Sequence, residues 1–272
     1  MKNERNKERK IKEFKPFSML YACLVYIFLY LPIAVVIAFS FNTSERNITF
    51  EGFTFEWYGK MFENTQLMQS FYNTLIVAVV STALSVVLGT LCAVGLSRLE
   101  SKLKSVISNA LYIPIIIPEL VFGIAMLVFF SSVNIEMSMF TLIVSHVTFS
   151  MPFVVITVRS RIAGFDHSIE EAARDLGANE FRTFMKVTLP MIMPGVVSGG
   201  MLALTISLDD VVVSYFTAGA DSTTLPLKIM GMVKKGVSPD VNALSTFMIV
   251  GTVFILLVST KIQNRLEEKQ GV

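Results

Sequence analysis

Six long apolar runs are the strongest constraint on how this 272-residue chain folds. A helix needs about 20 apolar residues to cross a hydrocarbon core about 30 Å thick, and each run is long enough. Only 16% of the residues are charged, whereas soluble domains average about 25%. The sequence therefore predicts an all-α polytopic membrane protein with six transmembrane helices, at about residues 17–41, 72–97, 105–131, 137–158, 191–215 and 242–260.

The six runs belong to one transmembrane domain, residues 17–262, between a basic N-terminus (1–16) and a short tail (263–272). The first run is too long for the apolar region of a signal peptide and lacks a small-residue cleavage site. We therefore expect it to be a retained span.

Basic residues predict the orientation, because cytoplasmic loops of membrane proteins are enriched in lysine and arginine. In a six-span topology, 18 of the 23 basic residues lie on one side, in the N-terminus, the loops at 98–104 and 159–190, and the residues after the last predicted span. The other side receives five. Both termini and the 159–190 loop are therefore predicted to be cytoplasmic, and no basic residue lies within a predicted span.

The 159–190 loop is too polar to lie in the bilayer and has the pattern of two short helices. Ser168 and Glu171 have the spacing of a capping box, and Gly177 suits a left-handed helix end. Asn179 is expected to cap the second helix, and Pro190 to end it. Such an amphipathic pair fits a groove on a soluble partner; an ordinary loop on the membrane surface is the alternative.

Three carboxylates fall inside the apolar runs: Glu119, Asp209 and Asp210. A charged group there costs at least about 2.5–3.5 kcal/mol and is a candidate functional site. With no basic residue in any span, the acids are protonated, paired with another subunit, or exposed to a cavity for a cationic substrate. Pro118 precedes Glu119, so a broken helix with free carbonyls is expected there. For the two aspartates, a helix end near the headgroups is the alternative.

Other polar and small residues have two interpretations each. Ser207 shares a helix face with Asp210, so its hydroxyl can supplement the acid. Trp57 is an interfacial anchor or an aromatic wall that binds a cation. His146 is a packing residue, with a proton relay as the alternative. Gly195 and Gly199 form a GxxxG pair for close packing, with a second subunit or within this chain.

The loop also carries a family resemblance. Glu171-Ala172-Ala173, Gly177 and Leu189-Pro190 resemble the EAA signature of permease subunits of bacterial ABC importers. This resemblance implies that the loop docks on a separate ATP-hydrolysing subunit, and it assigns a coupling role to these residues and to Glu180. Val187 departs from the isoleucine that is usual in the family.

A second resemblance covers nearly all of residues 20–262. The segments SLDDVVVSY (207–215) and LPLKIMGMVKKGVSPDVNAL (225–244), Trp57 in GFTFEWY and the acid at Glu119 resemble the second permease of spermidine/putrescine importers. It implies a bacterial cytoplasmic-membrane complex with a homologous permease, two ATP-binding subunits and an extracytoplasmic polyamine-binding protein. The substrate-pathway residues that it implies are Glu119, Asp209, Asp210, Ser207 and Trp57.

The motifs that are absent narrow the function further. The chain has no GxxxxGK[ST] phosphate loop and no HExxH motif, so we expect a transport subunit rather than an enzyme. It should hold no cofactor or metal itself, ATP and magnesium being bound by the partner subunits. The alternatives are an ABC permease for another cation, such as ferric iron or thiamine, and a proton-coupled secondary transporter, which would not need the EAA loop. An anion permease would need basic groups in its cavity.

Overall fold

A computed structural model describes residues 2–44, 49–99, 102–164, 166, 168–233 and 239–270. Every regular element in these residues is helical, apart from one bridge between Asn42 and Phe53. The helices are α1 (Lys2–Phe39), α2 (Glu56–Glu63), α3 (Thr65–Arg98), α4 (Lys102–Ile116), α5 (Glu119–Ser132), α6 (Met139–Ile162), α7 (Ser168–Asp175), α8 (Glu180–Thr183), η1 (Phe184–Thr188), α9 (Leu189–Asp209), α10 (Val212–Thr217), α11 (Leu225–Val233) and α12 (Pro239–Gln270).

Five helical segments are long and apolar enough to cross a membrane, and the bent pair α4–α5 makes a sixth if it counts as one broken span. The predicted all-α fold is therefore confirmed, with five or six candidate membrane spans. The chain divides into two compact units, one formed by Met1–Asn64 and Val237–Val250 and the other by Thr65–Gly236 and Gly251–Val272. The first contains α1 and α2, and the second contains α3 to α11; α12 contributes to both.

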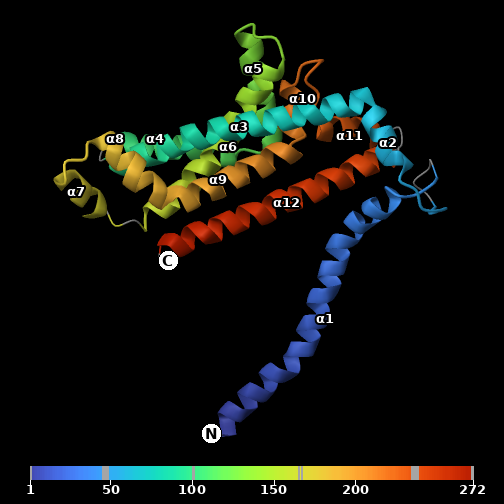
Figure 1. Cartoon of the computed structure of the whole chain (residues 1–272), viewed down its shortest axis with the longest axis horizontal. Coiled ribbons are helices and arrows are strands. Elements are labelled where there is room, and N and C mark those ends of the chain that lie inside the picture. The colour runs from blue at the N-terminus through green and yellow to red at the C-terminus, as the bar shows by residue number, and fades with distance from the viewer. Residues whose placement is uncertain are drawn as a thin grey trace. The chain divides into compact units, whose positions relative to one another are not determined.

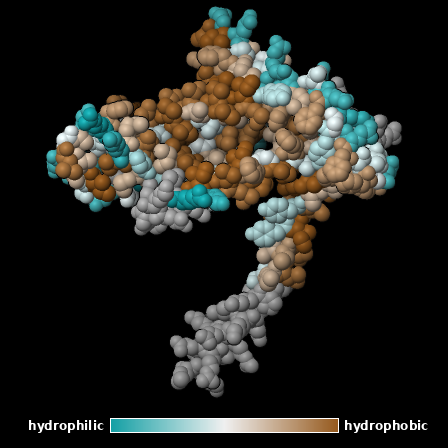
Figure 2. Space-filling view, in the orientation of Figure 1, coloured by the Kyte–Doolittle hydropathy of each residue, from teal (hydrophilic) through white to brown (hydrophobic). Residues whose placement is uncertain are grey.

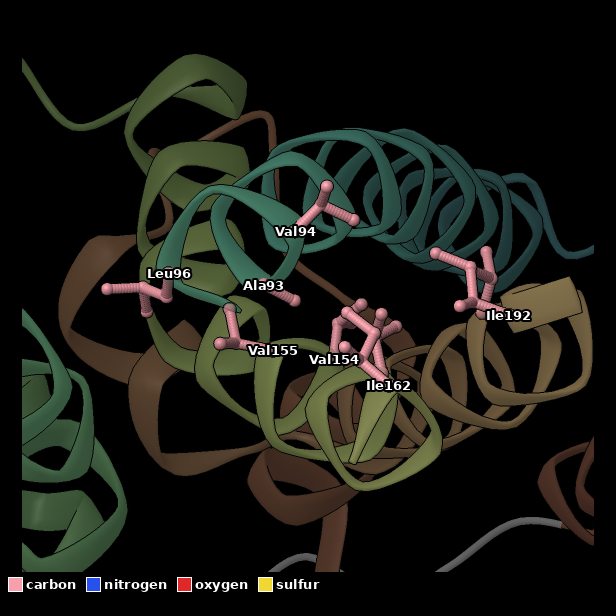
Figure 3. Packing of buried hydrophobic residues seen from close by; sticks show 10 residues of the cluster. Ala93, Val94, Leu96, Val154, Val155, Ile162 and Ile192 are labelled. Carbon is pink, nitrogen blue, oxygen red and sulfur yellow. The ribbon is translucent and has the colours of Figure 1, made fainter. Parts of the chain in front are cut away.

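Three helices of the second unit, α3, α6 and α9, lie side by side (Figure 1). Their contact is a cluster of small and branched apolar side chains (Figure 3). The cluster consists of Ala93, Val94 and Leu96 of α3, Val154, Val155, Val158 and Ile162 of α6, and Ile192, Val196 and Ala203 of α9. Space-filling side chains along α3 and α9 are largely apolar (Figure 2), as expected for helices that contact lipid.

Glycines allow these helices to approach closely. A Cβ atom at Gly199 would lie 3.1 Å from the Cα atom of Val154, and one at Gly195 would lie 2.9 Å from the Cβ atom of Arg161. At Gly200 it would lie 2.9 Å from a methyl group of Val86. The GxxxG pair thus packs against α6 of the same chain. Of the two possibilities that the sequence left open, the structure shows packing within the chain.

A pair of glycines in α3 gives a test of this packing. A Cβ atom at Gly89 would lie 2.9 Å from Val154, whereas nothing lies within 4 Å of one at Gly95. We expect Gly89→Ala to destabilise the folded chain by about 1–3 kcal/mol through overpacking. Gly95→Ala should be neutral or stabilising by up to about 1 kcal/mol, because alanine is the better helix former. Melting temperatures of the two detergent-solubilised variants check this; equal shifts would contradict the close contact of α3 and α6.

The predicted span at 105–131 is broken into two helices at Pro118, as expected from the sequence. Helices α4 and α5 meet at 109° with a break between Ile116 and Glu119. Pro118 explains the position of the break, because proline disfavours helical backbone in the residue before it. The carbonyl group of Pro118 also accepts the first hydrogen bonds of α5, from the N–H groups of Val121 and Phe122. The break places Glu119 at the start of α5.

The expectation that Pro190 ends a helix is wrong. Helix α8 continues through the π-helical turn η1 into α9, so that Glu180–Asp209 is one apolar helical segment. Pro190 lies in the first turn of α9, where a missing N–H group is tolerated. The N–H group of Leu189 bonds to the carbonyl of Phe184, five residues back, as in a π-turn. The wider turn thus carries the helix past the proline.

Candidate functional site

Two helix breaks come together in the second unit and bring acidic residues from distant parts of the chain into one cluster. Glu119 is the first residue of α5, and Asp209 is the last residue of α9. Asp210 follows with an extended backbone (φ −62°, ψ 128°) before α10 begins. The carboxyl groups of Glu119 and Asp210 lie close to each other. Helices α5 and α10 can approach so closely because Gly123 leaves room for Phe216.

Asp210 is buried and its carboxylate accepts several hydrogen bonds. The backbone N–H and the hydroxyl of Ser214 both donate to Oδ2, over 2.7 and 2.6 Å. The N–H of Val213 donates to Oδ1 over 3.2 Å. Nε2 of His146 lies 3.3 Å from Oδ2. The aspartate therefore stabilises the first turn of α10, where backbone N–H groups lack partners within the helix.

Asp209 and Glu119 are the accessible acids of the cluster. The side chain of Asp209 is exposed, and that of Glu119 is half-buried. Among the ion pairs of the residues that the structure describes, neither acid is paired with a lysine or an arginine. The two neighbouring aspartates thus differ: one is held inside the protein and the other is presented at its surface.

Ser207 joins the cluster through hydroxyl and imidazole groups. Its hydroxyl lies 2.7 Å from Nδ1 of His146 and 3.2 Å from the hydroxyl of Ser81. All three side chains are buried. Sequence reasoning identified Ser207 but treated His146 mainly as a packing residue and did not consider Ser81. The signal for His146 was its position in the middle of an apolar run; nothing in the sequence indicated Ser81.

The space beside this network is closed in the present conformation. It is too narrow for a water molecule. An ammonium group could therefore reach Asp210 only if the surrounding helices moved. The residues that border it are His146, Phe149, Ser150, Ile206, Ser207, Asp210 and Val213.

A larger polar hollow of about 590 Å³ lies near the N-terminal end of α3, in the same unit. Nζ of Lys228 donates to Oε1 of Gln66 over 3.0 Å. The amide of Asn73 donates to the carbonyl groups of Asp221 and Thr223 and so ties α3 to the segment before α11. The hollow offers mainly amide and hydroxyl groups to a ligand.

Trp57 lies in the first unit, so the structure does not place it relative to the acidic cluster. Its side chain is buried, and its indole N–H donates to the carbonyl of Asn42 over 2.6 Å. Nζ of Lys60 lies 4.4 Å from the centre of its ring. These contacts attach α2 to the loop after α1. A role of Trp57 in the substrate pathway stays a prediction.

The 159–190 loop forms two helices, as the sequence predicts. Gly177 has a left-handed backbone (φ 85°) after α7, and the side chain of Asn179 caps α8 by accepting from the N–H of Arg182. Ser168 does not precede α7 as the predicted capping box requires, because α7 begins at Ser168 itself. The N–H group of Ser168 donates to the carboxylate of Asp166. His167 lies outside the described residues.

The residues of the EAA signature lie mainly at the surface of this loop. Glu171, Ala172, Gly177, Glu180 and Pro190 are exposed, and Ala173 and Leu189 are half-buried. Two large apolar side chains beside them are strongly exposed, Leu176 at 89% and Phe181 at 72%. Part of the apolar face predicted for these helices is thus left uncovered by the chain itself.

The acid before the signature, Glu170, behaves differently and was missed from the sequence. It is buried, and its Oε1 lies 3.2 Å from the guanidinium of Arg98 at the end of α3. The hydroxyl of Thr188, in η1, donates to the same oxygen. Glu170 therefore connects α7 both to α3 and to the π-turn. Its position next to Glu171 offered no sign of this, because adjacent helical residues point in different directions.

Comparison with known proteins identifies this architecture. The family model "Binding-protein-dependent transport system inner membrane component" matches residues 85–271. The spermidine/putrescine transport system permease protein PotC of Escherichia coli K12 is 43% identical over 86% of this chain and 89% of its own length. The putrescine transport system permease protein PotI of the same organism is 34% identical over 89% of this chain and 88% of its own length.

Solved structures agree on the fold. A bacterial ABC transporter involved in the import of the acidic polysaccharide alginate matches with a TM-score of 0.70 and 18% identity, over 91% of this chain and 96% of the other. The resemblance to permease subunits that the EAA signature indicates is thus confirmed, as is the expectation of a transport subunit rather than an enzyme. The chain belongs to the family of binding-protein-dependent transport system inner membrane components.

Proposed function

We propose that this chain is a permease subunit of an ATP-driven importer for polyamines such as spermidine and putrescine. The observation that carries the proposal is the acidic cluster of Glu119, Asp209 and Asp210 at two helix breaks. Polyamines carry several ammonium groups, which carboxylates and free carbonyls recognise through charge-assisted hydrogen bonds. The names of the relatives, a spermidine/putrescine permease and a putrescine permease, support the same substrate class.

The proposal includes partners that supply the remaining functions. A homologous second permease would complete the translocation path, and two ATP-binding subunits would bind ATP and magnesium, so that this chain needs no cofactor. An extracytoplasmic polyamine-binding protein would deliver the substrate, in keeping with the family's binding-protein-dependent description. The complex would lie in the bacterial cytoplasmic membrane, with both termini of this chain inside, because the basic residues gather on that side.

The exposed face of α7 and α8 is the proposed docking surface for the ATP-binding subunit. It combines the uncovered apolar side chains of Leu176 and Phe181 with the exposed carboxylate of Glu171. A groove on a soluble partner takes up such an amphipathic pair. Glu180, Leu189 and Pro190 lie where this surface joins α9, which suits a role in coupling.

Transport would proceed by alternating access. In the present conformation the accessible acids are Glu119 and Asp209, and the space at Asp210 is closed. ATP-driven movement of the docking loop would shift α9 and open the helix breaks toward the opposite side. The acids then offer successive carboxylates to the ammonium groups of a passing polyamine.

Uptake of radiolabelled spermidine tests the proposal. Cells that lack their own polyamine import would express the chain alone and then together with the subunits encoded beside it. We expect uptake only with the partners, lost on ATP depletion but retained with an uncoupler at clamped ATP. Uptake by the chain alone that an uncoupler abolishes would identify a secondary carrier. No spermidine uptake with all partners present would refute polyamines and direct the test to other cations.

The docking surface has its own test in Gly177→Val. A branched side chain at a left-handed position costs roughly 1–3 kcal/mol, so the turn between α7 and α8 should change shape. We expect co-purification of the ATP-binding subunit to fall by about tenfold, which corresponds to about 1.4 kcal/mol. Gly164→Val is the matched control, because a Cβ atom there would make only an ordinary contact, 3.8 Å from the carbonyl oxygen of Arg161, and the backbone is not left-handed. Equal co-purification of both variants would contradict docking at this turn.

A further inference from the structure

His146 occupies the centre of the buried polar network and uses both ring nitrogens. It lies in α6 and is 4% exposed. Nδ1 contacts Ser207 of α9 over 2.7 Å. Nε2 contacts the hydroxyl of Ser214 in α10 over 3.1 Å and the carboxylate of Asp210 over 3.3 Å. One imidazole ring thus joins three helices at the break between α9 and α10.

The partners of Nε2 determine where the imidazole carries its proton. The hydroxyl of Ser214 already donates to Asp210, and an ionised carboxylate can only accept. Both groups near Nε2 are therefore acceptors, which assigns the proton to Nε2. Nδ1 contacts the hydroxyl of Ser207, which also lies 3.2 Å from the hydroxyl of Ser81, itself a donor to the carbonyl of Ala78.

Among the residues that the structure describes, only His146 provides the Asp210 carboxylate with a polar contact from one of the helices α3, α6 and α9. The other donors, Val213 N–H and the N–H and hydroxyl of Ser214, belong to the α10 turn next to it in sequence. They determine the local turn but not its position against α6. The contact with His146 ties the start of this turn to α6, and the hydroxyl of Thr141 in α6 donates to the carbonyl of Thr217 at its end. The Glu119 carboxyl lies beside Asp210.

We propose that His146 is a positioning residue of the substrate path, whose ring holds Asp210 and Ser207 together and so presents Glu119 and Asp209 to the substrate. The inference rests on the proposed transport of polyamines. In this conformation the space around the ring is closed, so we assign to His146 a role that acts through Asp210.

Two amide variants separate the two ring contacts. Glutamine places its amide nitrogen near the position of Nε2, and asparagine near that of Nδ1. In the complete transporter reconstituted in proteoliposomes, we expect His146→Gln to keep the maximal rate of radiolabelled spermidine uptake within about threefold of wild type. His146→Asn should lower it about tenfold or more, because it leaves the Asp210 contact unmade. The KM for spermidine should change in neither, since the binding protein delivers the substrate.

A double variant and a control complete the experiment. If His146 acts through Asp210, uptake by His146→Asn with Asp210→Asn should be no lower than by Asp210→Asn alone. Ser85→Ala, which removes a buried hydroxyl contact of 2.8 Å between α3 and α6, should leave uptake unchanged. Equal losses in the Gln and Asn variants, in proportion to lost complex, would show a merely structural role and overturn the inference. Wild-type uptake rates in both the Gln and the Asn variant would also overturn the inference. A wild-type complex that moves no spermidine would instead refute the proposed function itself.

Discussion

Asp209→Asn is expected to reduce the maximal rate of spermidine uptake by about tenfold or more, because a charge-assisted hydrogen bond contributes about 1.5–3 kcal/mol. The complex should retain its melting temperature, since the Asp209 side chain is exposed. Asp210→Asn should differ: it weakens the acceptor of the α10 turn and of His146, so it should lower the melting temperature as well as uptake. Initial rates at saturating spermidine, set beside thermal melts of the purified complex, measure both effects.

Thr205→Ala is the matched control for Asp209→Asn. Thr205 is exposed on the same helix, and its hydroxyl bonds back to the carbonyl of Met201. It should therefore change neither the uptake rate nor the melting temperature. Normal uptake by Asp209→Asn would return Asp209 to the alternative interpretation, an exposed acid at a helix end near the headgroups.

Glu170→Ala is expected to release α7 from the rest of the loop. It removes the acceptor shared by Arg98 and Thr188 and leaves both donors unpaired, at a cost of roughly 1–3 kcal/mol. Hydrogen exchange of the α7 amides should then speed up by about tenfold, and the number of spermidine molecules moved per ATP should fall. Mass-spectrometric exchange on the assembled complex, combined with ATPase and uptake assays, measures this.

Asp175→Ala removes the same charge from the same helix at an exposed position, where a substitution changes stability by about 0.5 kcal/mol or less. Its exchange rates should match those of wild type. If Glu170→Ala and Asp175→Ala exchange alike, Glu170 does not hold α7 in place, and another contact must link the docking surface to α3.

The membrane-spanning elements could be predicted because each is encoded locally. An apolar run of sufficient length has to satisfy its backbone hydrogen bonds within itself, and a helix does so. Gly177 and Asn179 were recognisable for the same reason, because a left-handed turn and a helix cap depend on one residue and its neighbours. The acids Glu119, Asp209 and Asp210 stood out because the apolar runs contain no basic partner.

What depends on tertiary structure could not be predicted. Asp209 is exposed and Asp210 is buried because the helix breaks after α9 and because His146, a residue of another helix, contacts Asp210. Similarly, Glu170 is buried because Arg98 and Thr188 lie around it, and neither is near it in the sequence. Pro190 misled the prediction, since the π-turn that accommodates it has no simple sequence signature.

The helical segment from Glu180 to Asp209 is continuous, so it connects the docking surface to the acids without an intervening loop. Its 30 residues correspond to about 45 Å at 1.5 Å per residue. A tilt of about 10° at the α8 end would displace the Asp209 end by about 8 Å over such a length. No flexible loop lies between the two ends to absorb the motion. A small rotation of the proposed docking surface would therefore displace Asp209 by more than the length of a hydrogen bond.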